Sequence, residues 1–266
     1  MYVVDRNSMS YRVHIGILGP LTVVGPGGQA IALRGQRQQI VLVLLAMSSG
    51  QPVSTERLIS AIWEGNPPRT VMGQLQTSVW MLRQALLPVC QTQDTVLTHD
   101  FGYRLAEGVY TLDAVDFRKN VSSARQSQRG GDLPEALRQL RRGLAMWRGP
   151  SLTGINSSLV QAAARRLDDE RVAALEYRMT VELALGHHDD VVDELRELVS
   201  QHPTRERLHA DLMLALYRCG RQVEALAAFR KACRVLAEEY GLDPGPRLRD
   251  MAQAILQQDP GILIGP

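Results

Sequence analysis

Apolar and polar positions alternate at the start of this chain of 266 residues. Val, Ile and Leu recur through residues 13–24, and Ile31 and Leu33 alternate with small residues after the turn Gly25-Pro26-Gly27-Gly28. A period of two residues is typical of half-buried strands. The pattern therefore predicts a β-hairpin whose two strands lie on either side of the Pro/Gly turn.

The spacing of apolar positions then becomes helical, with repeats every three or four residues. Three helices are expected, over residues 36–48, 54–63 and 70–87. The second helix begins at Ser54 or Thr55, because either hydroxyl group can cap its first turn.

Two short β segments follow, at residues 95–98 and 103–105, around the turn His99-Asp100-Phe101-Gly102. They predict a second hairpin. The order of a sheet, three helices and a hairpin resembles the OmpR-type winged helix, in which the hairpin is the wing.

From about residue 115 the pattern is helical almost throughout, interrupted by three similar segments that contain Gly131, Gly186 and Gly220. The last two glycines are 34 residues apart, which is the tetratricopeptide period. Each helix pair of such a repeat has an apolar face that only a neighbouring pair can bury. We therefore expect a mainly α-helical protein, with a winged helix over residues 13–110 and an all-α, tetratricopeptide-like domain over residues 113–258.

The predicted helix over residues 70–87, which Pro88 is expected to end, has an uncharged outer face. Its inward stripe consists of Leu75, Val79, Leu82 and Leu86. Gln and Thr can hydrogen-bond to base edges in the major groove, and glycine permits close approach to the duplex. The residues assigned to this contact are Thr70, Gly73, Gln74, Thr77, Trp80, Met81 and Gln84. A polar surface helix with Trp80 buried against another element explains the pattern equally well.

Basic side chains flank this helix face. Arg69 precedes the helix and Arg83 lies near its end, and both are assigned to DNA phosphates. In the second hairpin, His99, Tyr103 and Arg104 surround the glycine turn and are assigned to the minor groove or its phosphates. Tyr103 can equally be a core anchor of the hairpin.

The charge of the chain gives little support to nucleic-acid binding. Its formal net charge is +2, and the first 112 residues contain eight Arg against six Asp and Glu. Any DNA contact therefore depends on where a few arginines are placed.

Other chemistries lack the residue patterns that they require. His187-His188-Asp189-Asp190 resembles a metal cluster, but its counterpart in the next repeat, Gly220-Arg221-Gln222-Val223, contains no ligand types. Neither a phosphate-binding loop nor a nucleophile elbow is present, so we expect no cofactor, no metal and no enzymatic activity. No long apolar span or signal peptide occurs, and the three cysteines fit no ligand spacing. We therefore expect a cytoplasmic, nucleoid-associated protein that does not bind membranes.

Two sets of motifs carry a family resemblance that extends from about residue 13 to 258. The first set comprises residues 53–63, 67–70, 75–76, 82–86 and 102–105, and the second comprises residues 144–150, 171–176, 202–208, 212–222 and 238–246. The first resembles the DNA-binding half of the Streptomyces antibiotic regulatory protein family, and the second resembles its bacterial transcriptional activation domain. The chain resembles the small form of this family, which lacks the ATPase region of some larger relatives. It departs from the family at Val71-Met72-Gly73-Gln74, where Arg or Lys is often found.

The resemblance implies a transcription activator that binds direct repeats near the −35 region of promoters for antibiotic or other secondary-metabolite clusters. It also implies recruitment of RNA polymerase with its principal sigma factor. We expect a dimer on double-stranded promoter DNA, with the loop residues Glu64, Gly65 and Asn66 available to the polymerase. Two alternatives stay open: a repeat-type adaptor whose winged helix binds protein, and a regulator gated by a ligand in the helical domain.

Overall fold

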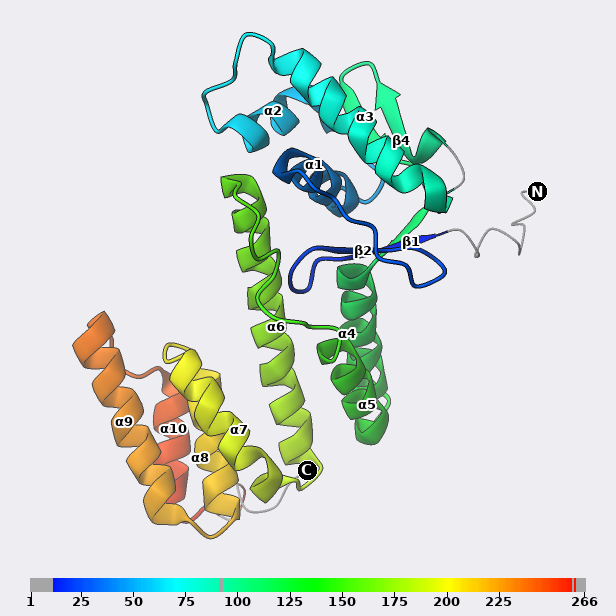
Figure 1. Cartoon of the computed structure of the whole chain (residues 1–266). Coiled ribbons are helices and arrows are strands. Elements are labelled where there is room, and N and C mark those ends of the chain that lie inside the picture. The colour runs from blue at the N-terminus through cyan, green and yellow to red at the C-terminus, as the bar shows by residue number, and fades with distance from the viewer. Residues whose placement is uncertain (1–11, 91–92, 260, 262–266) are drawn as a thin grey trace. The chain divides into compact units, whose positions relative to one another are not determined.

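The structure is a computed structural model that describes residues 12–90, 93–259 and 261. The chain divides into two compact units. The first contains the residues up to Lys119 together with Gly143–Arg171, and the second contains Asn120–Arg142 and the residues from Val172 onward. The described part is mainly helical, with small sheets near the N-terminus and an all-α region after them, which confirms the predicted fold class (Figure 1).

The first sheet has the strand order β2-β1-β6. Its strands are β1 (Val13–Gly16), β2 (Thr22–Val24) and β6 (Tyr110–Leu112). β1 runs antiparallel to β2 and parallel to β6. The chain therefore returns to its first strand just before the long helical region begins.

The prediction of a hairpin across the Pro/Gly turn is confirmed only in part. An isolated antiparallel bridge joins Val24 to Ala30 across the turn, and the N–H of Ile31 donates to the carbonyl oxygen of Val23 at 2.8 Å. β2 pairs with β1, and residues 31–33, which the structure describes, form no strand. The chain turns earlier because the N–H groups of Ile17 and Leu18 donate to the buried carboxylate of Asp113, at 2.8 and 3.1 Å. These two amides are therefore not available to a longer strand ladder.

Three helices follow, as predicted: α1 (Gln36–Met47), α2 (Thr55–Trp63) and α3 (Val71–Cys90). Ser54 caps α2, because its Oγ accepts a hydrogen bond from the N–H of Arg57 at 3.2 Å. Pro88 does not end α3, contrary to the prediction. The helix continues for two more residues, Val89 and Cys90, whose burial stabilises the last turn although the proline lacks an N–H donor.

The second sheet forms the predicted wing and has the strand order β3-β5-β4. A short 3-10 turn, η2 (Gln93–Thr95), leads into it, and its strands are β3 (Val53–Ser54), β4 (Val96–His99) and β5 (Gly102–Leu105). Only glycine fits at position 102, because a Cβ atom there would lie 2.0 Å from the carbonyl oxygen of Val53. This close approach fixes the wing against the start of α2.

The rest of the described chain is helical: α4 (Asp113–Arg129), α5 (Leu133–Leu144), α6 (Ser158–Ala184), α7 (His188–Gln201), α8 (Glu206–Arg218), α9 (Gln222–Tyr240) and α10 (Pro246–Leu256). Gly131, Gly186 and Gly220 lie in the turns between helices, with φ of 81, 86 and 74°. These left-handed conformations favour glycine, which confirms the predicted helix hairpins.

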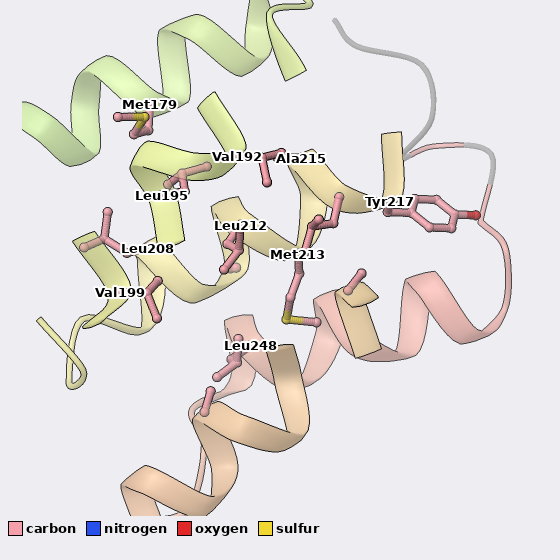
Figure 2. Close-up of a cluster of buried hydrophobic side chains, with 14 of the residues drawn as sticks. Met179, Val192, Leu195, Val199, Leu208, Leu212, Met213, Ala215, Tyr217 and Leu248 are labelled. Atoms are coloured by element: carbon pink, nitrogen blue, oxygen red, sulfur yellow. The ribbon is translucent and has the colours of Figure 1, made fainter. Parts of the chain in front are cut away.

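A core of buried side chains from α6 to α10 holds most of the second unit together. Figure 2 shows part of it, with Met179 of α6, Leu195 of α7, Met213 of α8 and Leu248 of α10. Leu212, Leu216 and Leu236 are also buried in this core, while Leu226 and Phe229 are partly buried against it.

Candidate nucleic-acid interface

Helix α3 packs into the first unit through a single stripe. The stripe residues Leu75, Val79, Leu82 and Leu86 are at most 2% exposed. They follow the spacing i, i+4, i+7 and i+11, which places them on one side of a helix. The inward face predicted from the sequence is therefore confirmed, and the opposite face of α3 is directed away from this core.

The opposite face of α3 is exposed to solvent although it carries large apolar side chains. Trp80 is 56% exposed and Met81 is 44% exposed, beside the exposed residues Gly73, Thr77 and Gln84. The packing explanation, in which Trp80 is buried against another element, is wrong. Large apolar side chains that are held in water and carry no packing role are typical of binding surfaces.

A chain of hydrogen bonds orients Gln74 on this face. Its Nε2 donates to Thr70 Oγ1 at 2.9 Å, and its Oε1 accepts from Arg37 Nη1 at 2.7 Å. The Arg37 guanidinium also lies 5.1 Å from the centre of the Trp63 ring, within the range of a cation–π contact. Arg37 was not predicted as part of this site, because it belongs to α1 and no spacing in the sequence connects it with α3.

The two arginines assigned to phosphates have different surroundings. Arg69 is exposed just before α3 begins. Arg83 instead donates through Nε and Nη2 to the carbonyl oxygen of Val96, at 2.9 and 2.7 Å, and through Nη2 to Thr98 Oγ1. Arg83 therefore joins α3 to strand β4 of the wing, and its guanidinium positions the two elements relative to each other.

The wing residues also separate into packing and surface groups. Tyr103 is 8% exposed, so its ring packs in the core and the expectation of a DNA contact is corrected. Arg104 Nε donates to His99 Nε2 at 2.8 Å, on the half-exposed side of the hairpin. Phe101 at the tip is 60% exposed and was not predicted, although a large apolar residue in a tight turn is a usable signal.

The loop between α2 and α3 contains the residues assigned to polymerase. Glu64, Gly65 and Asn66 are exposed, and Glu64 ends α2 in a left-handed conformation with φ of 48°. Its Oε1 accepts a hydrogen bond from the N–H of Ser158 at 2.6 Å. Glu64 therefore caps the start of α6, which accounts for its orientation without a partner protein.

Alternative chemistries find little support in the described residues. These residues contain no group of three or more His, Cys, Asp or Glu that is arranged to hold a metal ion. In the His187-His188-Asp189-Asp190 turn, His187 Nδ1 lies 2.7 Å from Glu182 Oε2. None of the helices in the described ranges has the length and apolar character needed to cross a membrane.

Comparisons with known proteins place this geometry in a family. Residues 112–256 match the bacterial transcriptional activator domain. The regulatory protein DnrI of Streptomyces peucetius is 31% identical, with 94% of each chain covered. The regulatory protein AfsR of Streptomyces coelicolor is 36% identical over 95% of this chain, which spans only 25% of AfsR.

A solved structure has the same fold as this chain. Mycobacterium tuberculosis EmbR, in complex with a low-affinity phosphopeptide, superposes with a TM-score of 0.87 at 31% identity, over 93% of this chain and 65% of EmbR. EmbR is a transcriptional regulatory protein by name. The chain therefore belongs to the bacterial transcriptional activator domain family, as a transcriptional regulator of the Streptomyces antibiotic regulatory protein type.

Proposed function

We propose that this chain is a sequence-specific, DNA-binding activator of transcription for a secondary-metabolite gene cluster. The observation that carries the proposal is the exposed, uncharged face of α3, on which Trp80 and Met81 are held in water opposite a fully buried stripe. An α-helix with such a face fits the major groove, where Gln and Thr can contact base edges. Membership of a family of transcriptional regulators supports the same conclusion.

In this proposal each element has a distinct role. Helix α3 enters the major groove, with Gln74 and Thr77 at the bases and Arg69 at a phosphate. The wing lies over the neighbouring backbone, where Arg104 and Phe101 are its accessible side chains. Arg83 acts indirectly, because it binds the wing strand.

Activation requires partners beyond the DNA. We infer from the family that two protomers bind side by side on direct repeats near the −35 region, and that they recruit RNA polymerase with its principal sigma factor. Gly65 and Asn66 of the α2–α3 loop are exposed and accessible for this contact, whereas the Glu64 carboxylate caps α6.

The test is footprinting of the purified chain on promoter DNA from its own genomic neighbourhood, over a series of salt concentrations. We expect protection of repeated half-sites spaced by about one helical turn, and a steep loss of protection as salt rises. Absence of protection at every salt concentration would favour the adaptor function, in which the winged helix binds protein.

A pair of variants makes this test specific for α3. Trp80→Ala removes the exposed ring from the proposed interface, and Leu256→Ala removes a side chain that is 65% exposed on α10. Both variants should fold, since surface substitutions change stability by about 0.5 kcal/mol. We expect loss of protection for Trp80→Ala alone, and equal protection by both variants would contradict the assignment of this face.

A further inference from the structure

A cavity of about 750 Å³ opens at the surface of the first unit, between the helices of the winged helix and the start of α6. Leu44 and Met47 of α1 contribute to its wall on one side. The start of α2 and the tip of the wing contribute Arg57 and Phe101, and α6 closes the cavity with residues between Leu159 and Glu170. Its volume falls within the range of small-molecule sites, about 300–1,000 Å³.

The lining of this cavity combines an apolar surface with an excess of positive charge. Leu44, Leu159 and Leu167 are among its apolar groups, and Ala162 and Ala163 leave room along α6. A charged ligand in such a place must be matched by charged protein groups, because burying an unpaired charge is costly.

The charged residues of the lining are three arginines and a single glutamate. Arg118 forms a two-pronged pair with Glu170, through hydrogen bonds of 2.7 and 2.8 Å, so these two charges compensate each other. Arg57 and Arg166 have no carboxylate within ion-pair distance in the described part of the chain. The cavity therefore carries two positive charges at its exposed edge that no described acidic side chain pairs with.

We propose that this cavity binds a small organic anion with an apolar body, held by Arg57 and Arg166. The guanidinium group presents a planar set of N–H donors that matches a carboxylate, sulfonate or phosphate. The apolar body of the ligand lies along Leu44, Leu159 and Leu167, where it removes their surface from water.

Such a ligand would connect two parts of the first unit. It would contact α1, α2 and the wing tip on one side and α6 on the other. Because a ligand shifts a conformational equilibrium by its differential affinity, occupancy is expected to change the affinity for DNA. This consequence rests on the proposed function, whereas binding of the anion does not.

The test uses the full chain and the dye 8-anilino-1-naphthalenesulfonate, an aromatic anion whose fluorescence rises in apolar sites. We expect saturable binding of one dye molecule per chain, by fluorescence and calorimetry. The same rings without the sulfonate, in N-phenyl-1-naphthylamine, should bind about tenfold more weakly, because a hydrogen bond to a charged group is worth roughly 1.5–3 kcal/mol.

Two matched pairs of variants locate the site. Arg166→Gln removes a lining charge, and Arg165→Gln removes the neighbouring charge on α6. Both side chains are exposed, but only Arg166 lines the cavity. Ala162→Phe fills the cavity, and Ala173→Phe adds the same ring to an exposed position of α6 outside it. We expect about tenfold weaker dye binding for Arg166→Gln and Ala162→Phe, and unchanged binding for the other two.

The outcomes are distinguishable from those of the DNA experiment. Dye binding that is equal in all four variants, or that never saturates, would overturn the proposed anion site whether or not the chain binds DNA. Loss of dye binding in Arg166→Gln with unchanged binding of N-phenyl-1-naphthylamine would support it directly. Melting temperatures of the variants show whether each one is folded.

Discussion

Helices α3 and α8 differ in how their apolar and polar residues are distributed between the core and the surface. α8 has nine buried residues among its 13, since α7, α9 and α10 all pack against it. α3 has seven buried residues among its 20 and exposes Trp80 and Met81. A helix in the middle of a repeat array is apolar because it packs on several sides, whereas packing does not explain the apolar residues outside the stripe of α3.

The polar residues sharpen this contrast. α8 buries His209 and Asp211, which are 3% and 4% exposed. His209 Nε2 lies 2.9 Å from the carbonyl oxygen of Pro203, and Asp211 Oδ1 lies 3.6 Å from Arg247 Nη2. Burial raises the pKa of Asp211 to about 6, although the charges of Arg247 and Arg207 lower it. α8 thus holds polar side chains inside the fold, whereas α3 holds the apolar side chains of Trp80 and Met81 at the surface.

The largest expected effect is on stability, for a leucine in the centre of the repeat array. Leu216→Ala in α8 should lower the free energy of unfolding by about 2–5 kcal/mol, because it leaves a cavity in the core. Leu256→Ala, at a position that is 65% exposed, is the matched control and should change it by about 0.5 kcal/mol. Urea unfolding followed by circular dichroism measures both, and similar values would contradict the assigned core.

The second expected effect depends on pH. The folded-state pKa of Asp211, about 6, is above the unfolded value of 3.8, so its protonated form is favoured in the folded state. The resulting stabilisation is complete below pH 3.8 and is lost as pH rises through 6. Asp211→Asn should therefore become more stable than the wild type by up to about 3 kcal/mol between pH 4 and pH 7.

The control for this pH effect is Asp193→Asn, because the Asp193 side chain is 97% exposed. Urea unfolding at several pH values should show the same pH dependence for this variant as for the wild type. A difference between Asp211→Asn and the wild type that stays constant from pH 4 to pH 7 would show that Asp211 does not titrate as proposed.

The third expected effect is on DNA sequence preference. Gln74→Ala should alter the preference at one base pair by about 1–3 kcal/mol, since it removes the side chain assigned to a base edge. Arg69→Ala should instead weaken binding to all sequences by a similar factor. It should also reduce the slope of log K against log salt by about one, the value expected for one lost phosphate contact. Binding titrations on operator and random DNA measure both, and equal losses on the two DNAs for both variants would refute these roles.

The smallest expected effect concerns Gly73 in the first turn of α3. A Cβ atom added there meets nothing within 4 Å, so the free protein has room for a side chain. Gly73→Ala should raise the free energy of unfolding by up to about 1 kcal/mol, because alanine favours helix. It should weaken operator binding, because the methyl group lies on the face that is proposed to approach DNA. Unchanged operator affinity would show that close approach is not required at Gly73.

Local patterns predicted the parts of the fold that depend on neighbouring residues. The stripe of α3, the cap at Ser54 and the turns at Gly131, Gly186 and Gly220 all follow from spacing or from backbone conformation within a few residues. The exposed face of α3 was predicted as a candidate site for the same reason. Whether Trp80 was exposed or packed stayed open, because its environment depends on elements far away in the chain.

Contacts between residues far apart in the sequence could not be predicted from such patterns. Asp113 ends β1 by accepting hydrogen bonds from Ile17 and Leu18, which are about 95 residues away in the chain, and so residues 13–24 form two paired strands where one was predicted. Arg148 donates to the same carboxylate at 3.0 Å. This contact lies within the first unit, which therefore includes residues 143–171 as well as the winged helix.

By itself, the amino-acid sequence determined the type and approximate extent of the helices and the face of α3 that is directed outward, because the spacing of apolar residues depends only on neighbours one or two turns away in the same helix. Only the tertiary structure decided that Trp80 is exposed, that Arg37 is bonded to Gln74, and that Arg83 holds the wing. Those three facts depend on which side chains meet across different elements, and that is set by packing of the whole unit.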